Sequence, residues 1–129
     1  MSQTFVVAQK AQNRPNSISV ARLVSAANTV NATLVKATGG RVYKIMGQNA
    51  ATAVRYLKLY NKATAPTVGT DTPFMTIPIA ASSVFQVSFE GIGLYFDKGI
   101  GFGITNLNAD ADTTAPTAAD ILGLTIAYC

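Results

Sequence analysis

The sequence predicts an all-β fold, an antiparallel β-sandwich of about eight or nine short strands. Three observations predict it. Short runs of β-branched and aromatic residues recur along the chain, whereas apolar residues at helical spacing are scarce. Gly, Pro and Asn separate these runs at close intervals, as in sandwiches and barrels. None of the runs precedes a helical pattern of roughly 10 to 15 residues, which disfavours a parallel α/β sheet.

The arm and the strands of the first half follow from breaker residues and alternation. A polar N-terminal arm is expected over residues 1–16, because Arg14-Pro15-Asn16 interrupts regular structure, and the sandwich domain is expected over residues 17–129. One domain suits this length. The first four strands are expected at Ile18–Ala26, from Val30 to the Thr38-Gly39-Gly40 turn, at Arg41–Gln48 and at Ala53–Asn61.

The second half alternates more cleanly. Strands are expected at Phe74–Ile79, Phe85–Phe89, Leu94–Asp97, Ile100–Leu107 and Leu122–Tyr128. Phe85, Val87 and Phe89 should face the core, and Leu122, Leu124 and Ile126 should likewise share one face. Pro78 has no amide hydrogen to donate, so its strand should lie at a sheet edge or contain a bulge.

Two long connections decide between sandwich topologies. Lys62–Pro73 and Asn108–Asp120 suit crossings between sheets better than hairpin turns, which favours a jelly roll. Lys62–Pro73 is expected to cross the end of the sandwich as a fixed loop, in which Gly69 supplies any positive φ. An immunoglobulin-like sandwich is the alternative, although the chain has one Cys and no Trp and so lacks the marks of that fold.

Missing residue types exclude most catalytic chemistry. The chain has no His, and its single Cys is Cys129, so a Ser-His, Cys-His or His-metal site is ruled out and an intrachain disulfide is impossible. Nothing in the sequence places two of the six acids across a cleft. We therefore expect no enzyme, no cofactor and no catalytic residue. Neither a cleaved secretion signal nor an apolar run long enough for a membrane is expected.

Charge is scarce and unevenly distributed. Charged residues make up 12% of the chain, about half the usual share. Nine of the ten basic residues lie between Lys10 and Lys62, and all six acids lie from Asp71 onward. This order allows a basic surface that faces an acidic or phosphate-bearing partner. The cations are scattered about one per strand, however, so solvated strand faces or a protein contact explain them more simply than nucleic acid does.

Two motifs resemble ligand loops. Gly99-Ile100-Gly101-Phe102-Gly103 lacks the spacing of a phosphate loop, and is better explained as a strand whose bare face packs closely against a neighbour. The polar series Asn106, Asn108, Asp110 and Asp112 has the spacing of some calcium loops, but it lacks the required Gly and distal Glu. Ordinary turn chemistry explains it equally well, so cation binding stays open.

A family resemblance begins at Leu59–Pro73, which reads LYNKATAPTVGTDTP. Together with Ile77-Pro78-Ile79, Phe89–Leu94, Gly99–Thr105 and Asp112-Thr113-Thr114, this segment resembles small virion structural proteins of tailed phages. The similarity covers about Ala53–Tyr128. The closest functional type is the jelly-roll decoration (cement) protein that binds the outside of a phage head.

The resemblance implies a function and a partner. It implies a virion structural protein made in the host cytoplasm, placed on the capsid exterior and bound to the major capsid protein, as a dimer or trimer. An adhesin or fibre-associated module for host attachment is the alternative. Neither nucleic acid nor membrane is an expected partner. The partner contact is expected in the arm and the first strand, at Phe5, Val6, Val7, Lys10, Arg14 and Arg22.

Overall fold

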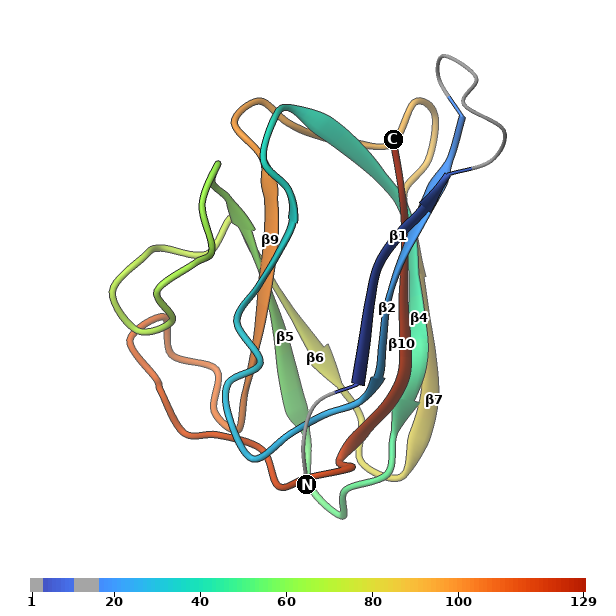
Figure 1. Cartoon of the computed structure of the whole chain (residues 1–129). Helices are drawn as coiled ribbons and strands as arrows, with labels where there is room; N and C mark the ends of the chain where they lie inside the picture. Colours follow the sequence, from blue (N-terminus) through green and yellow to red (C-terminus); the bar gives the residue numbers. More distant parts are fainter. Residues whose placement is uncertain (1–3, 11–16) are drawn as a thin grey trace.

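The computed structural model describes residues 4–10, by their backbone, and residues 17–129. The described residues form ten strands, and the expected antiparallel β-sandwich is confirmed (Figure 1). The strands are β1 (Thr4–Lys10), β2 (Ser19–Ser25), β3 (Thr33–Lys36), β4 (Gly40–Asn49), β5 (Arg55–Asn61), β6 (Met75–Ile79), β7 (Ser83–Ser88), β8 (Leu94–Phe96), β9 (Ile100–Thr105) and β10 (Ile121–Tyr128).

The two sheets differ in size. The larger has the order β1-β2-β10-β4-β7, and the smaller has the order β3-β9-β5-β6. In the larger sheet β8 also pairs with β4, at Gly40–Val42, whereas β7 pairs with Lys44–Asn49 of the same strand. Four antiparallel pairs are nested along the chain: β2 with β10, β3 with β9, β4 with β7, and β5 with β6. Because the outer and inner pairs alternate between the sheets, the chain resembles one long hairpin folded over itself.

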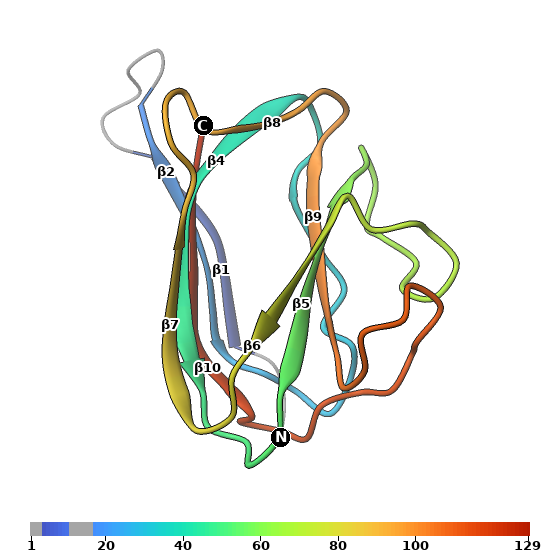
Figure 2. The same ribbon diagram turned by 180° about the vertical axis from the view of Figure 1, so that it is seen from behind.

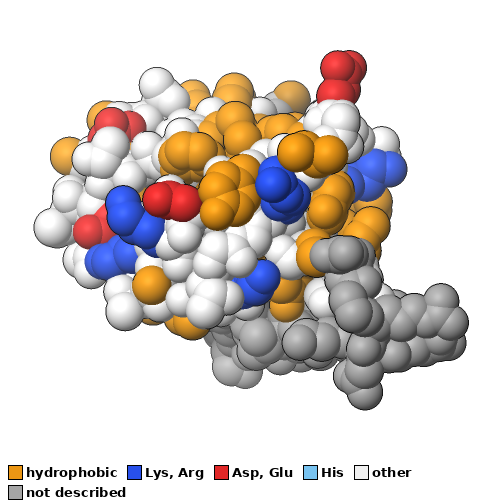
Figure 3. All heavy atoms as spheres, turned by 90° about the horizontal axis from the view of Figure 1, so that it is seen from above, with side chains coloured by type: hydrophobic (Ala, Val, Ile, Leu, Met, Phe, Trp, Pro, Cys, Tyr) orange, Lys and Arg blue, Asp and Glu red, His pale blue; other side chains and the backbone are white. Residues whose placement is uncertain are grey.

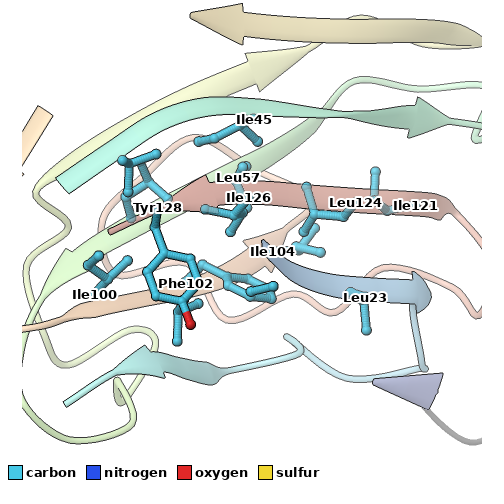
Figure 4. Packing of buried hydrophobic residues seen from close by; sticks show 14 of the residues in the cluster. Leu23, Ile45, Leu57, Ile100, Phe102, Ile104, Ile121, Leu124, Ile126 and Tyr128 are labelled. Atoms are coloured by element: carbon cyan, nitrogen blue, oxygen red, sulfur yellow. The ribbon is translucent and has the colours of Figure 1, made fainter. Parts of the chain in front are cut away.

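Side chains that point inward from both sheets form one core (Figure 4). The larger sheet contributes Leu23, Ile45 and Ile126, and the smaller contributes Leu57, Phe102 and Ile104. Phe85, Val87 and Phe89 pack against this core and are partly buried, as their alternation predicted. Pro78 also lies where its missing amide hydrogen predicted, on the edge strand β6 of the smaller sheet.

One predicted face is wrong at a bulge in β10. Leu124 and Ile126 are buried, but Leu122 pairs with Gln48 on the outer side of β4. The register shifts between Leu122 and Thr125, and Gly123 between them has φ of 60°. A bulge adds one residue to a strand, so the residues on either side of it no longer follow a single alternation.

The loop of residues 62–74 is also placed differently from the expectation. It joins β5 to β6, which are neighbours in the same sheet, and so it is not a crossing. Figure 2 shows it beside the loop of residues 106–120, on the side of β5 and β9 that faces away from the larger sheet. The second loop does cross between the sheets, since it joins β9 to β10. Gly69 has the positive φ expected of it, 93°.

Much of the expected arm is paired backbone. Residues Thr4–Lys10 form β1, which lies antiparallel to β2 at one edge of the larger sheet. Residues 1–3 and 11–16 of the expected arm, Arg14 among them, lie outside the described residues. The part of the arm with the Phe5-Val6-Val7 run therefore extends the sheet of its own chain.

Candidate binding surface

The expected partner contacts lie on two neighbouring strands. Four of them, Phe5, Val6, Val7 and Lys10, belong to β1, and Arg22 belongs to β2. The pairing places Val6 opposite Arg22 and Lys10 opposite Ser19. The side chain of Arg22 is exposed and points away from the core, because Ala21 and Leu23 on either side of it are buried.

The register extends this face across the larger sheet. Arg22 lies opposite Thr125, Thr125 opposite Met46, and Met46 opposite Gln86, which makes one row across β2, β10, β4 and β7. A second row contains Val20, Ala127, Lys44 and Ser88, and a third contains Leu122, Gln48 and Val84. The term basic sheet face is used below for the surface that these rows form, with Arg22, Lys44, Met46, Val84, Gln86 and Leu122 as its principal residues.

A shallow apolar groove runs across this face. Its volume is about 450 Å³, and it lies between β4, β7 and β10. The groove is lined by Met46, Gly47, Gln48, Val84, Phe85, Gln86, Leu122 and Gly123. Val84 is 81% exposed and Met46 is 37% exposed. In Figure 1, none of the described loops lies over this outer side of β4, β7 and β10.

The charges of the basic sheet face are all positive. The strands of the larger sheet contain Lys10, Arg22, Arg41 and Lys44 but not a single acid, since all six acids lie between strands. The salt bridges found among the described residues are Arg55 to Asp120, at 3.0 Å, and Lys62 to Asp71, at 2.6 Å. Within that part of the chain, Arg22 and Lys44 consequently have no acidic partner.

The outer face of the smaller sheet is covered by the chain itself. A Cβ added at Gly103 would lie 2.6 Å from Cγ2 of Val68, and one added at Gly101 would lie 3.0 Å from Cδ of Pro66. The glycines of β9 thus leave room for the loop of residues 62–74. This confirms the expected close packing of the glycine run.

The second loop packs against the first. A Cβ at Gly69 would lie 2.3 Å from Cγ2 of Thr113. Val68 and Gly103 belong to the segments on which the family resemblance is based, and Gly69 and Thr113 belong to the same set. Three of those segments, Leu59–Pro73, Gly99–Thr105 and Asp112–Thr114, therefore pack together on the outer side of β9.

Two polar side chains are buried beneath these loops. Lys58 is fully buried, and its Nζ donates a hydrogen bond of 2.6 Å to the carbonyl oxygen of Ala109. Burial lowers the pKa of Lys58, and the nearby charges of Asp112 and Asp110 oppose that shift. The interpretation of this lysine as part of a solvated strand face is therefore wrong. The Lys58 side chain instead attaches the loop of residues 106–120 to β5.

Tyr60 lies on the same side of β5. Burial, together with the charges of Asp71 and Asp110, raises the pKa of Tyr60 to about 12. The hydroxyl of Tyr60 is buried and has no hydrogen-bond partner among the described residues. An uncharged phenol suits this position, because ionising it would place a buried anion near two carboxylates.

Two of the four side chains proposed for a calcium loop, Asn106 and Asp112, make hydrogen bonds within the loop itself. Nδ2 of Asn106 donates to the carbonyl of Ala115 at 2.9 Å. Oδ2 of Asp112 accepts hydrogen bonds from the Thr114 hydroxyl at 2.6 Å and from the Leu107 amide at 3.1 Å. Desolvation raises the pKa of Asp112, but these bonds outweigh it and the pKa is lowered. Within the described ranges, there is no group of three or more His, Cys, Asp or Glu placed to hold a metal.

A smaller apolar surface lies at the end of the sandwich that carries the C terminus. Figure 3 looks onto this end and shows apolar side chains between basic and acidic ones. The guanidinium of Arg41 lies 4.8 Å from the ring centroid of Tyr95, which is 53% exposed. Phe74 contacts the buried Phe96, with 4.9 Å between ring centroids. This end is amphipathic.

Comparison with protein-family models, with curated proteins and with solved structures found no match in any of the three. Among the described residues there is also no helix long and apolar enough to cross a membrane. The description of this chain therefore depends on its own residues.

Only part of this surface was predicted from the sequence. Arg22 was expected to contact a partner, and it lies on the basic sheet face. Met46, Val84, Gln86 and Leu122 were missed, because only the strand order brings β4, β7 and β10 beside β2. The sequence also shows that these strands contain no acids, but only the strand order shows that they form one continuous basic surface.

Proposed function

We propose that this chain is a virion structural protein that binds the outer surface of a phage capsid and stabilises it. The observation that carries the proposal is the contrast between the two outer faces. The smaller sheet is covered by its own loops, whereas the larger sheet exposes an apolar groove among unpaired cations. Exposed apolar surface of this kind marks interaction sites in soluble proteins. The phage assignment itself is supported by the sequence resemblance.

The fold suits such a role. We propose that the four nested strand pairs form a jelly roll, because that fold is a long hairpin rolled into two sheets. The well-packed core and the loops held over the smaller sheet give a rigid body that presents one face. Such a body suits a protein that acts by binding.

Stabilisation then follows from linkage. A protein that binds the assembled shell, but not separated capsid subunits, favours assembly by RT ln(1 + [L]/Kd) at each site. At a free concentration 100 times the Kd this is about 2.7 kcal/mol. Summed over a shell, small contributions oppose expansion and heat rupture. Dimers or trimers on the shell are part of the proposal, and the free outer edge of β7 supports them as a place for strand pairing between copies.

The test begins with stoichiometry in purified particles. We expect a copy number comparable to that of the major capsid protein, and particles from a phage with this gene deleted should rupture at a lower temperature. Adding the purified chain should restore the rupture temperature. If the chain is absent from intact particles, or if its addition leaves the rupture temperature unchanged, the proposed function is wrong.

One observation favours the adhesin alternative. Tyr95 and Phe74 expose aromatic rings at the end of the sandwich, and amphipathic aromatic rings are common at binding interfaces. An adhesin would be present in far fewer copies than the capsid protein, and its loss would reduce adsorption to host cells without changing the rupture temperature. The same particles therefore separate the two functions.

A further inference from the structure

We propose that the basic sheet face is the docking surface of this protein, and that its partner is an acidic protein surface with apolar side chains at its centre. The inference rests on the proposed function, under which that surface belongs to the capsid shell. It moves the expected contact from an extended arm to a sheet face that includes only Arg22 among the residues expected from the sequence.

The first argument is the arrangement of charge. Lys44 and Arg22 lie in adjacent rows of the face, on either side of Ala127 and Thr125. The strands beneath them contain no acid, so the charge of the face is not neutralised within the sheet. A partner with carboxylates opposite these cations would complement them, and such complementarity sets both the encounter rate and the register of an interface.

The second argument is the apolar groove between β4, β7 and β10. Met46, Val84 and Leu122 line it, and Val84 is almost fully exposed to water. Interface cores combine apolar side chains with a polar rim, and this face has that arrangement, with Gln86 and Gln48 beside the groove. Burying these side chains supplies the attraction that charge pairs at a rim do not supply.

Charge also excludes the simplest alternative occupant. Two copies that met face to face would place Arg22 and Lys44 of one copy against a sheet whose strands contain cations and no acids. Like charges brought together in an interface cost several kcal/mol. A second copy is therefore a poor occupant of this face.

Nucleic acid is a poor occupant too. Tight binding to a duplex uses roughly 6 to 10 phosphate contacts, whereas this face offers few cations and has an apolar groove beside them. The size of the face agrees with a protein partner. Four strands about 4.8 Å apart and three rows about 6.8 Å apart cover roughly 400 Å², about half of one partner's share of a standard interface. A single copy should therefore bind with modest affinity, which is sufficient if many copies act together on one shell.

The experiment compares two matched pairs of variants of the full chain, with purified particles that lack the chain as the probe. Lys44→Glu changes the basic sheet face, and Lys98→Glu makes the same charge change at an exposed loop lysine away from it. Val84→Glu and Leu107→Glu form the second pair, since both side chains are exposed but only Val84 lines the groove.

We expect Lys44→Glu and Val84→Glu each to weaken particle binding by about tenfold or more, and their controls to change it by less than about twofold. If the wild-type chain binds particles and each variant binds like its control, the docking surface is wrong while the proposed function stands. If the wild-type chain does not bind particles, the proposed function fails and this inference fails with it. A 20-base-pair DNA duplex is the comparison probe, and DNA binding that Lys44→Glu abolishes while particle binding is unaffected would overturn the inference.

A second measurement needs no variant. Native particles and the free chain are acetylated under matched conditions, and the modification rate of each lysine is measured by mass spectrometry. Docking through the basic sheet face should slow modification of Lys44 by about fivefold or more in particles, because contact excludes the reagent. Lys98 should be modified at the same rate in both. Equal rates at Lys44 in particles and in the free chain would overturn the inference.

Discussion

The close contact between the loop of residues 62–74 and strand β9 can be tested by a double-mutant cycle at Gly103 and Val68. A Cβ at Gly103 would lie 2.6 Å from Cγ2 of Val68, whereas carbon atoms in contact are normally about 3.5 to 4.0 Å apart. The next atom, the carbonyl oxygen of Val30, is 3.5 Å away. Val68 is therefore the main obstacle to Gly103→Ala, and the loop must move by about 1 Å to accept it.

The expected magnitudes follow from the contact. Overpacking costs about 1 to 3 kcal/mol, and loss of glycine flexibility in the unfolded chain returns about 0.4 to 1 kcal/mol, so Gly103→Ala should lower the free energy of unfolding by about 1 to 2 kcal/mol. Val68→Ala should lower it by about 1.5 kcal/mol, because two buried methylene equivalents are lost. In the double variant the added methyl fills the space that Val68 leaves. Its loss should be about 1.5 kcal/mol, well below the sum of the two single losses.

The assay is urea unfolding of the four proteins, with the coupling free energy taken from the cycle. Gly91→Ala combined with Val68→Ala is the control, because Gly91 has φ of 65° and no atom within 4 Å of an added Cβ. Its cost comes from the left-handed backbone alone, so that pair should be additive. Additivity within about 0.5 kcal/mol for Gly103 and Val68 as well would refute the packing of the loop on β9.

Two further predictions concern buried polar groups. Asn49→Ala should lower the free energy of unfolding, measured in urea, by about 2 to 4 kcal/mol. The reason is that the buried Nδ2 of Asn49 donates to the carbonyl of Ile79 at 3.1 Å, and its Oδ1 accepts from the Ala51 amide at 3.0 Å. A loss under about 0.5 kcal/mol would contradict this role. Tyr60→Phe should leave stability at neutral pH unchanged or raised, since the hydroxyl has no described partner. Because the pKa of Tyr60 is raised from 10.0 to about 12, the unfolded chain loses this proton first, and wild-type stability should fall from pH 10 to 12. Thermal unfolding should show a smaller fall in Tyr60→Phe over the same pH range. An equal fall would contradict the raised pKa of Tyr60.

Local pattern was enough to locate most of the strands. Alternation and breaker residues placed nine strands within a few residues of those in the structure, and Pro78 identified an edge. The failures depend on information that is not local. A bulge at Gly123 moved Leu122 to the outer face, and a glycine looks the same in a sequence whether it forms a bulge or a regular strand.

The candidate surface was harder to predict than the strands. Lys58 appears in sequence as one more cation on a strand, yet its hydrogen-bond partner, the carbonyl of Ala109, is 51 positions away along the chain. Arg22 was identified from its charge alone. Its neighbours Met46 and Val84 come from strands that the fold brings together, and a single sequence does not specify which strands pair.

The asymmetry between the two outer faces connects composition to the proposed function. With charged residues at 12% of the chain, few cations are available, and four of them lie in the larger sheet without an acid among its strands. The acids lie in loops, where Asp71 and Asp112 hold backbone amides and hydroxyls of their own loops. Asp71 and Asp112 thus help to order the covered side, whereas Arg22 and Lys44 lie on the open side without an acidic partner among the described residues. Arg22 and Lys44 form no salt bridge that would stabilise the described part of the monomer, whereas a protein that docks on an acidic partner gains attraction from such cations.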